Sequence, residues 1–199
     1  MIYLIGGAPR CGKTILSHRI ARHKKISWIS TDSLQPVILP YIPKSQVLKK
    51  FPYQKVSLQK DKPETLLAAE ITESNTTWPG IKALIQHQID CNQDFIIEGV
   101  HLLPGLVYEL KRTRYWKNIK LIYLVKIDLE KIKQGFLKNT STHDWLFSSL
   151  KNEEILDKAA RMVQIKSQYI ATQAKQFDFK VVNMDIDFNK KIKKLAAEI

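Results

Sequence analysis

Eight residues near the start of the chain have the types and the spacing of a loop that binds phosphate. Gly7 to Thr14 read Gly-Ala-Pro-Arg-Cys-Gly-Lys-Thr, a full match to the pattern G-x-x-x-x-G-K-[ST]. The glycines allow the backbone to turn several N–H groups toward one phosphate oxygen. The Lys13 ammonium would lie between the terminal phosphates, and the Thr14 hydroxyl would bind Mg²⁺. We therefore expect this loop to bind a nucleoside triphosphate together with Mg²⁺.

The expected nucleotide site includes the loop and the first turn of a helix. An apolar run at residues 2–5 precedes the loop, and Leu16 and Ile20 follow it at helical spacing. This order of strand, loop and helix directs the positive end of the helix dipole at the anion. The residues expected to contact the nucleotide are Gly7, Ala8, Pro9, Arg10, Cys11, Gly12, Lys13, Thr14 and Ile15.

Two acids follow predicted strands and are candidates for the chemistry of phosphoryl transfer. Residues 26–30 lead to Asp32, and residues 94–98 end on Glu98. Because the carboxyl ends of parallel strands meet at one edge of a sheet, both acids should face the phosphate loop. We assign Asp32 as the general base or the residue that orients the acceptor, and Glu98 as the acid that acts on Mg²⁺ through water. The two roles could be exchanged, and Asp32 also suits a helix N-cap.

Two further residues are candidates for contact with the acceptor. His101 precedes Pro104 in the loop after the third predicted strand, where it would contact substrate or make a local hydrogen bond. Lys138 lies beyond the fourth predicted strand and is the second candidate. Together with Asp32, these residues form the expected acceptor site.

The elements that must position these residues alternate along the chain. The expected strands are residues 2–5, 26–30, 94–98, 119–125 and 178–183. The expected helices are residues 14–24, 63–74, 79–92, a helix after Leu103 and a long helix at 152–176. In the long helix, a stripe is expected to pack on the sheet, formed by Leu156, Ala160, Val163, Ile170 and Ala174. The alternation predicts an α/β fold, a three-layer sandwich with a mostly parallel five-stranded sheet.

Residues 35–62 differ from the rest because they hold four of the eight prolines and several lysines with poor periodicity. They predict a flap beside the sheet, within a substrate-side helical insert at residues 35–92. Phe51, Tyr53 and Trp78 would line an acceptor pocket, or would pack the flap onto the domain, which is the commoner use of such residues.

The composition is that of an ordinary globular chain. Its 199 residues, 44% hydrophobic and 26% charged, predict a single domain over residues 1–199. No apolar run of about 18 residues and no leader-like start occurs, which predicts a cytoplasmic protein without a membrane partner. The net charge of +13 is spread along the chain, so nucleic acid is a possible partner that we do not favour over a small substrate. The sequence does not predict the oligomeric state.

The two cysteines, Cys11 and Cys91, fit neither a disulfide framework nor a zinc site. Cys11 lies beside a helix N-terminus and Lys13, which would lower the pKa of its thiol and make it redox-sensitive. A small side chain that fills the loop is the favoured alternative.

Three segments together resemble small P-loop kinases of the 2-phosphoglycerate-kinase-like and zeta-toxin-like group: GGAPRCGKT, WISTDSL and IIEGVHLLPG. The resemblance covers about the first 110 residues. It implies a compact kinase that uses ATP and Mg²⁺ to phosphorylate a small hydroxyl compound, with Asp32 at the acceptor-side aspartate. The later segment FDFKVVNMDIDF is similar to the last strand of such kinases and implies an adenine pocket near residues 183–187.

The chain departs from that group in its expected lid at residues 126–145. Such kinases place arginines there to neutralise the transferred phosphoryl group, whereas this chain offers Lys131, Lys133 and Lys138. Arg10 in the phosphate loop would compensate if it reaches the γ-phosphate or the acceptor; the alternative is an exposed side chain. We therefore assign Lys13, Asp32 and Arg10 as the catalytic residues.

Three functions from different classes fit these features. The favoured one is a small-molecule kinase that acts on a hydroxylated or phosphorylated substrate. A nucleic-acid end kinase or processing factor would use the basic surface, and a nucleotide-binding regulator would show little turnover. A switch GTPase is disfavoured, because Asn189-Lys190 is followed by Lys191-Ile192 and lacks the aspartate of an N-K-x-D motif.

Overall fold

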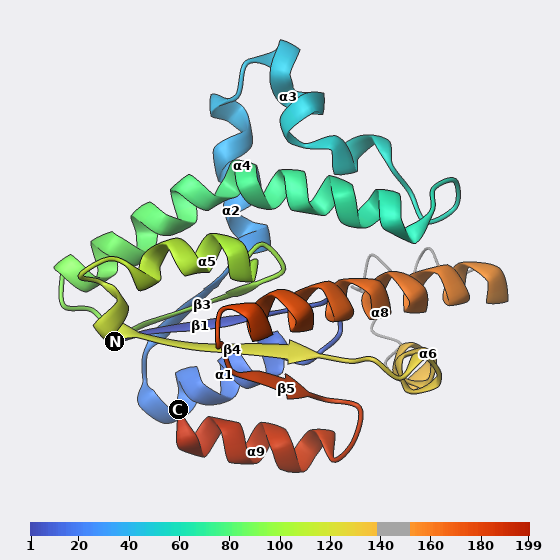
Figure 1. The fold of residues 1–199 in the computed structure, drawn as a ribbon. Coiled ribbons are helices and arrows are strands. Elements are labelled where there is room, and N and C mark those ends of the chain that lie inside the picture. The colour runs from blue at the N-terminus through green and yellow to red at the C-terminus, as the bar shows by residue number, and fades with distance from the viewer. Residues whose placement is uncertain (139–151) are drawn as a thin grey trace.

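The computed structural model describes residues 1–138 and 152–199. Five parallel strands form one sheet in the order β2-β3-β1-β4-β5 (Figure 1). The strands are β1 (Ile2–Gly7), β2 (Ser27–Ser30), β3 (Phe95–Gly99), β4 (Ile119–Val125) and β5 (Val181–Asn183). The predicted α/β fold with a five-stranded parallel sheet is therefore confirmed.

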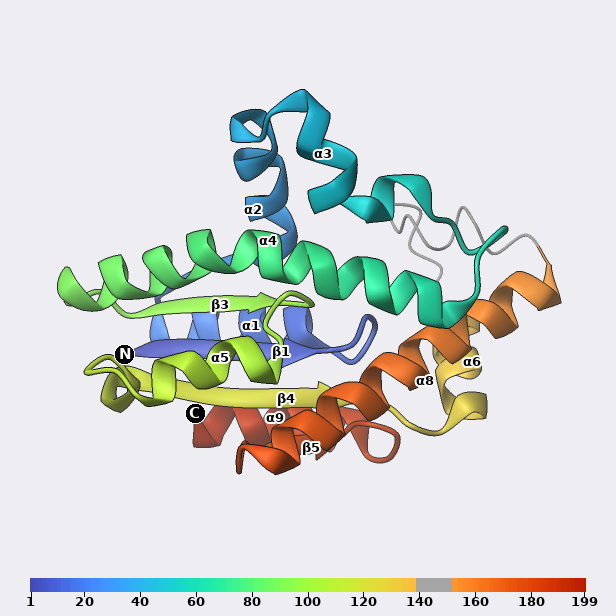
Figure 2. The same cartoon turned by 45° about the horizontal axis from the view of Figure 1, so that its top comes forward.

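Helices cover both faces of this sheet. They are α1 (Lys13–Lys24), α2 (Thr31–Ile38), α3 (Lys44–Lys50), α4 (Pro63–Asp90), α5 (Pro104–Lys111), α6 (Leu129–Lys138), α8 (Glu153–Gln176) and α9 (Phe188–Glu198). Figures 1 and 2 show α4, α5 and α8 over one face and α1 and α9 over the other. The result is the expected three-layer sandwich.

Alternate residues of β1 supply the two halves of the core, as the pleat of a strand requires. Ile2 and Leu4 pack in a cluster with buried side chains of α4 and α5. Tyr3 and Ile5 pack on the other side, in a cluster that includes Leu16 of α1. Since both faces are covered, β1 is buried along its whole length, which explains its uninterrupted apolar sequence.

The predicted break of the long fourth helix at Pro79 is wrong. Instead of two helices at residues 63–74 and 79–92, a single helix runs from Pro63 to Asp90 with Pro79 inside it. Apolar residues on both sides of the proline, including Leu66 and Ile81, are buried. Packing of this continuous face outweighs the local cost of the missing N–H group.

The residues between β2 and α4 form short helices. These are α2, α3 and two 3₁₀ turns, Leu39–Tyr41 and Pro52–Lys55. Figure 1 shows α3 above α4, on the side away from the sheet. Phe51 and Trp78 are buried, whereas Tyr53 lines the cleft described below. That residues 35–92 form an insert on the substrate side stays a prediction.

The long helix α8 confirms most of the predicted stripe. Ala160, Val163, Ile170 and Ala174 are buried, and Leu156 is half-buried. The expected lid at residues 126–145 is described as far as Lys138, where α6 ends; residues 139–145 lie outside the described part of the chain. Of the helices in the described part, none has the length and apolar character to cross a membrane.

Candidate active site

The phosphate loop connects β1 to α1 as its sequence predicts. Gly12 has a φ of 95°, and a Cβ atom there would lie 2.7 Å from the Phe188 ring. A residue with a side chain would be strained at this position, which explains the glycine of the motif. The Lys13 ammonium donates a hydrogen bond to the Ala8 carbonyl over 2.9 Å, so the lysine lies across the loop.

Glu98 at the end of β3 lies beside the phosphate loop. The Thr14 hydroxyl donates a 2.9 Å hydrogen bond to Glu98 Oε1, joining residues 84 positions apart. Glu98 is buried, and this burial raises the pKa of its carboxyl group, while Lys13 and the Thr14 hydrogen bond oppose the shift. A hydroxyl and a carboxylate therefore lie together, which are the oxygen donors that Mg²⁺ prefers.

An ion at Thr14 and Glu98 would need further ligands. Within residues 1–138 and 152–199, no group of three or more His, Cys, Asp and Glu side chains could hold a metal. Mg²⁺ commonly keeps several waters and binds phosphate oxygens through one or two protein groups. The pair thus fits an ion that arrives with a nucleotide.

Asp32 and His101 meet at the same edge of the sheet. His101 Nδ1 lies 2.9 Å from Thr31 Oγ1 and 3.5 Å from Asp32 Oδ1. Gly99 has a φ of 156°, and a side chain there would collide with Thr31, so the glycine permits this packing. Burial lowers the pKa of His101 and Asp32 opposes this effect, so the ring is mainly neutral.

Asp32 itself stands at the surface of this cluster. Its side chain is 66% exposed, while His101 is buried. The N-cap of α2 is Ser30, whose hydroxyl accepts a hydrogen bond from the Asp32 N–H group. Asp32 is therefore in the first helical turn, and its carboxylate is not used as the cap.

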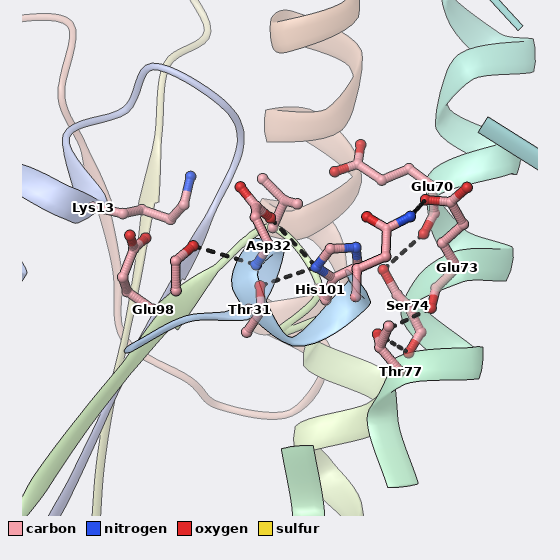
Figure 3. Close-up of polar contacts among 12 residues, drawn as sticks. Lys13, Thr31, Asp32, Glu70, Glu73, Ser74, Thr77, Glu98 and His101 are labelled. Carbon is pink, nitrogen blue, oxygen red and sulfur yellow. Dashed lines mark hydrogen bonds and ion pairs between the residues drawn. The ribbon is translucent and has the colours of Figure 1, made fainter. Parts of the chain in front are cut away.

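These residues line one cleft of about 460 Å³. Figure 3 shows Lys13 and Glu98 on one side of Asp32, and Glu70 and Glu73 on the other. The lining residues are Pro9, Arg10, Lys13, Thr14, Ser30, Asp32, Gln35, Tyr53, Glu70, Glu73, Glu98, Val100, His101 and Met162. The volume is that of a small-molecule site.

Three charged residues at this cleft escaped the sequence analysis. Glu70 and Glu73 come from α4 and line the cleft, and Lys166 of α8 is fully buried behind them. The Lys166 ammonium forms an ion pair with Glu70 and donates a 3.1 Å hydrogen bond to the Val100 carbonyl. A signal was present, because all three fall on the apolar stripes of their helices, where a charged residue needs a partner.

The second glutamate has neutral partners. Glu73 accepts hydrogen bonds from the Tyr53 N–H group over 2.8 Å and from the Gln35 amide over 3.2 Å. Burial raises its pKa to about 7, and nearby Glu70 adds to this shift. This carboxyl group is therefore poised to change its charge near neutral pH.

The lysines predicted for the lid do not line the cleft. Lys131 pairs with Asp128, and Lys133 pairs with Glu130 and Asp157. Lys138 is exposed at the end of α6. Their role at the transferred phosphoryl group stays a prediction, which the described geometry does not support for Lys131 and Lys133.

Arg10 and Cys11 occupy different places in the phosphate loop. The Arg10 guanidinium lies 4.8 Å from the centre of the Phe136 ring of α6, and the residue lines the cleft. Cys11 is fully buried, and burial raises its pKa despite the opposing charge of Lys13. The predicted lowering of the Cys11 pKa is therefore wrong, because desolvation outweighs the lysine, and burial agrees with the favoured alternative of a small side chain that fills the loop.

The expected adenine segment at residues 183–187 lies next to the phosphate loop rather than in the cleft. Asp185 Oδ2 accepts hydrogen bonds from the N–H groups of Ile127 and Asp128, over 2.9 and 3.1 Å. Phe188, directly after the segment, packs against Gly12. The contact of residues 183–187 with adenine stays a prediction.

Comparison with known proteins identifies the fold. No protein-family model matches the chain. Mevalonate-3-phosphate 5-kinase from Thermoplasma acidophilum is 27% identical over 125 residues, which are 62% of this chain and 60% of that relative. The chain thus aligns with about three fifths of the length of this curated relative.

Solved structures of other proteins have a similar fold over nearly the whole chain, although their sequence identity to it is low. Shikimate kinase from Bacteroides thetaiotaomicron has a TM-score of 0.56 at 13% identity, over 100% of this chain and 95% of that one. Shikimate kinase from Acinetobacter baumannii, in complex with shikimate, has a TM-score of 0.51 at 14% identity, over 99% and 92%. The chain has the fold of small P-loop kinases; its narrower resemblance to the 2-phosphoglycerate-kinase-like group stays a prediction.

Proposed function

We propose that the protein is an ATP-dependent phosphotransferase that moves the γ-phosphate of Mg-ATP to a hydroxyl group of a small molecule. The observation that carries this proposal is that Lys13 and Asp32 line the same cleft. The lysine of the phosphate-loop motif and an exposed carboxylate thus lie on two sides of one space. Phosphoryl transfer needs this arrangement, because the acceptor must approach the γ-phosphate in line with the leaving group.

The phosphate loop and Glu98 form the donor side. Loop N–H groups and the Lys13 ammonium would bind the phosphate oxygens, as the match to the motif implies. Thr14 would bind Mg²⁺, and Glu98 would act on it directly or through water. When bound, Mg²⁺ neutralises charge on the β- and γ-phosphate oxygens.

Asp32 would orient the acceptor and remove its proton. The hydroxyl oxygen forms a bond to the γ-phosphorus, while the bond from that phosphorus to the β,γ-bridging oxygen breaks. The hydroxyl proton moves to Asp32 and then to solvent, which the 66% exposure of this side chain allows. Neutral His101 fixes the start of α2 through Thr31 and lies next to the Asp32 carboxylate.

Arg10 is proposed to neutralise the transferred phosphoryl group. It is one of the two cationic residues among those that line the cleft in the described part of the chain. Its guanidinium over Phe136 also ties the phosphate loop to α6. An arginine fork suits an equatorial phosphoryl oxygen better than a lysine does.

The proposal is tested by γ-phosphate transfer from radiolabelled Mg-ATP to hydroxy acids, sugars, amino sugars, nucleosides and 5′-hydroxyl oligonucleotides. Lys13→Ala and Asp32→Asn should both lose the labelled product, whereas Arg19→Ala on the exposed face of α1 should keep it. Label on oligonucleotides alone would favour a nucleic-acid end kinase. ATP binding without transfer to any acceptor would favour a regulator.

A further inference from the structure

The acceptor half of the cleft is acidic. Asp32, Glu70 and Glu73 form what we call the acidic wall, opposite the phosphate loop. In the described part of the chain, the cationic residues that line the cleft are Arg10 and Lys13, both in the loop. His101, the remaining basic lining residue, is mainly neutral because it is buried. The side chains of the wall therefore suit a cationic group better than an anionic one.

The cation behind the wall compensates only part of this charge. Lys166 is fully buried and forms its ion pair with Glu70. Glu73 is only 3% exposed, and its hydrogen-bond donors are the neutral amides of Tyr53 and Gln35. A buried carboxylate without a cationic partner is costly, so Glu73 readily takes up a proton, and a ligand ammonium placed beside it would stabilise its charged form instead.

From this arrangement we infer that the acceptor is a hydroxyl compound that carries a cationic amino group, bound by Glu73 and Glu70 with its hydroxyl toward Asp32. The chemical class is an amino alcohol or an amino sugar. The inference rests on the proposed function, since it concerns the same cleft. It also separates this chain from the relative whose name denotes a phosphorylated acceptor.

The ammonium group of such a substrate would find carboxylate oxygens that can accept its hydrogen bonds. Glu73 keeps lone pairs beyond those used by Tyr53 and Gln35. Glu70 can likewise accept further hydrogen bonds besides the one from Lys166. Hydrogen bonds between an ammonium and a carboxylate are short and stronger than neutral ones. Together they would hold the amino group against α4 while the hydroxyl lies near the phosphate loop.

The test is a comparison of matched acceptors in γ-phosphate transfer from Mg-ATP. The amine probes are glucosamine and ethanolamine; their neutral counterparts are glucose with N-acetylglucosamine, and ethylene glycol; the anionic probes are glucose 6-phosphate, glycerate and shikimate. We expect an amine probe to exceed its neutral counterpart in kcat/KM by about tenfold or more, as a charge-assisted hydrogen bond implies. The advantage should fall by a similar factor in Glu73→Gln.

Glu64→Gln is the matched control, because Glu64 is exposed on the same helix and should leave the preference unchanged. The inference is overturned if a neutral or anionic probe is preferred, or if no amine probe is phosphorylated. Transfer to one of those other probes would leave the proposed function standing. Failure to bind Mg-ATP would instead overturn the proposed function, and the inference with it.

Discussion

Thr14 Oγ1 donates a hydrogen bond to Glu98 Oε1 over 2.9 Å, which joins the start of α1 to the end of β3. Since both groups are proposed to serve Mg²⁺, Thr14→Val should lose the Mg²⁺-dependent gain in ATP affinity, about tenfold or more, and keep the affinity seen with a chelator. A fluorescent ATP analogue, titrated with and without Mg²⁺, measures this gain. Thr14→Ser should retain it, and a full gain in Thr14→Val would remove Thr14 from the metal site.

Glu73 makes stability depend on pH. Its pKa rises from an ordinary value of 4.5 to about 7 in the folded protein. The folded state therefore binds the proton more tightly, and this stabilising contribution is lost as the pH rises through about 7. Glu73→Gln does not titrate, so it should match the wild type near pH 4 and exceed it by about 2 kcal/mol at pH 8.

Urea denaturation at several pH values measures this difference. In the described part of the chain, the titratable groups near Glu73 are Glu70 on its own helix, with Lys166 behind it, and Tyr53. Burial raises the pKa of the Tyr53 hydroxyl, so this group stays neutral. These groups remain in Glu73→Gln, so the pH-dependent difference in the free energy of unfolding comes from Glu73. A difference that is equal at pH 4 and pH 8 would contradict the assignment, and Glu64→Gln should show no pH-dependent difference.

The buried ion pair of Lys166 and Glu70 should be strongly coupled. Lys166→Met leaves Glu70 without its cation and should destabilise the fold by about 3–5 kcal/mol. Adding Glu70→Gln should restore much of that loss, because no charge then remains unpaired. Unfolding of both single variants and the double variant measures the coupling. Additive losses would show that the two side chains act independently.

Cys11 should resist thiol reagents in the native protein. It is fully buried with a raised pKa, whereas Cys91 is exposed. Iodoacetamide should therefore add one group, at Cys91, and a second only after denaturation. Mass spectrometry of the intact and digested protein locates the adducts. Labelling of Cys11 at a rate like that of Cys91 would contradict the burial.

Local pattern was enough to predict the strands and the phosphate loop, because their signals are contiguous in sequence. The first strand and the fourth lie within two residues of their expected ends, and Lys13 and Glu98 meet at one edge. The error at Pro79 arose because a local rule on proline was opposed by burial on both sides. Whether a helix continues through a proline depends on packing between segments that are distant in sequence, and a rule based on neighbouring residues carries no information about that packing.

The acceptor side could be predicted only in part. Asp32 and His101 follow strands, so topology places both at the same edge of the sheet, whereas their 3.5 Å approach was not predicted. Glu70 and Lys166 are 96 positions apart and meet only because α4 packs on α8. Their positions on apolar stripes indicate burial, but the pairing of two helices is a property of the whole fold.

The most direct test of the account follows the γ-phosphate itself. The protein would be incubated with ATP whose γ-phosphate carries oxygen-18 and with a mixture of small metabolites, and the products would be separated by mass spectrometry. Wild-type protein is predicted to form a labelled phosphate ester that is absent with Lys13→Ala and Asp32→Asn. Label found only in ATP and inorganic phosphate, or an ester formed equally by Asp32→Asn, would contradict phosphoryl transfer directed by Asp32.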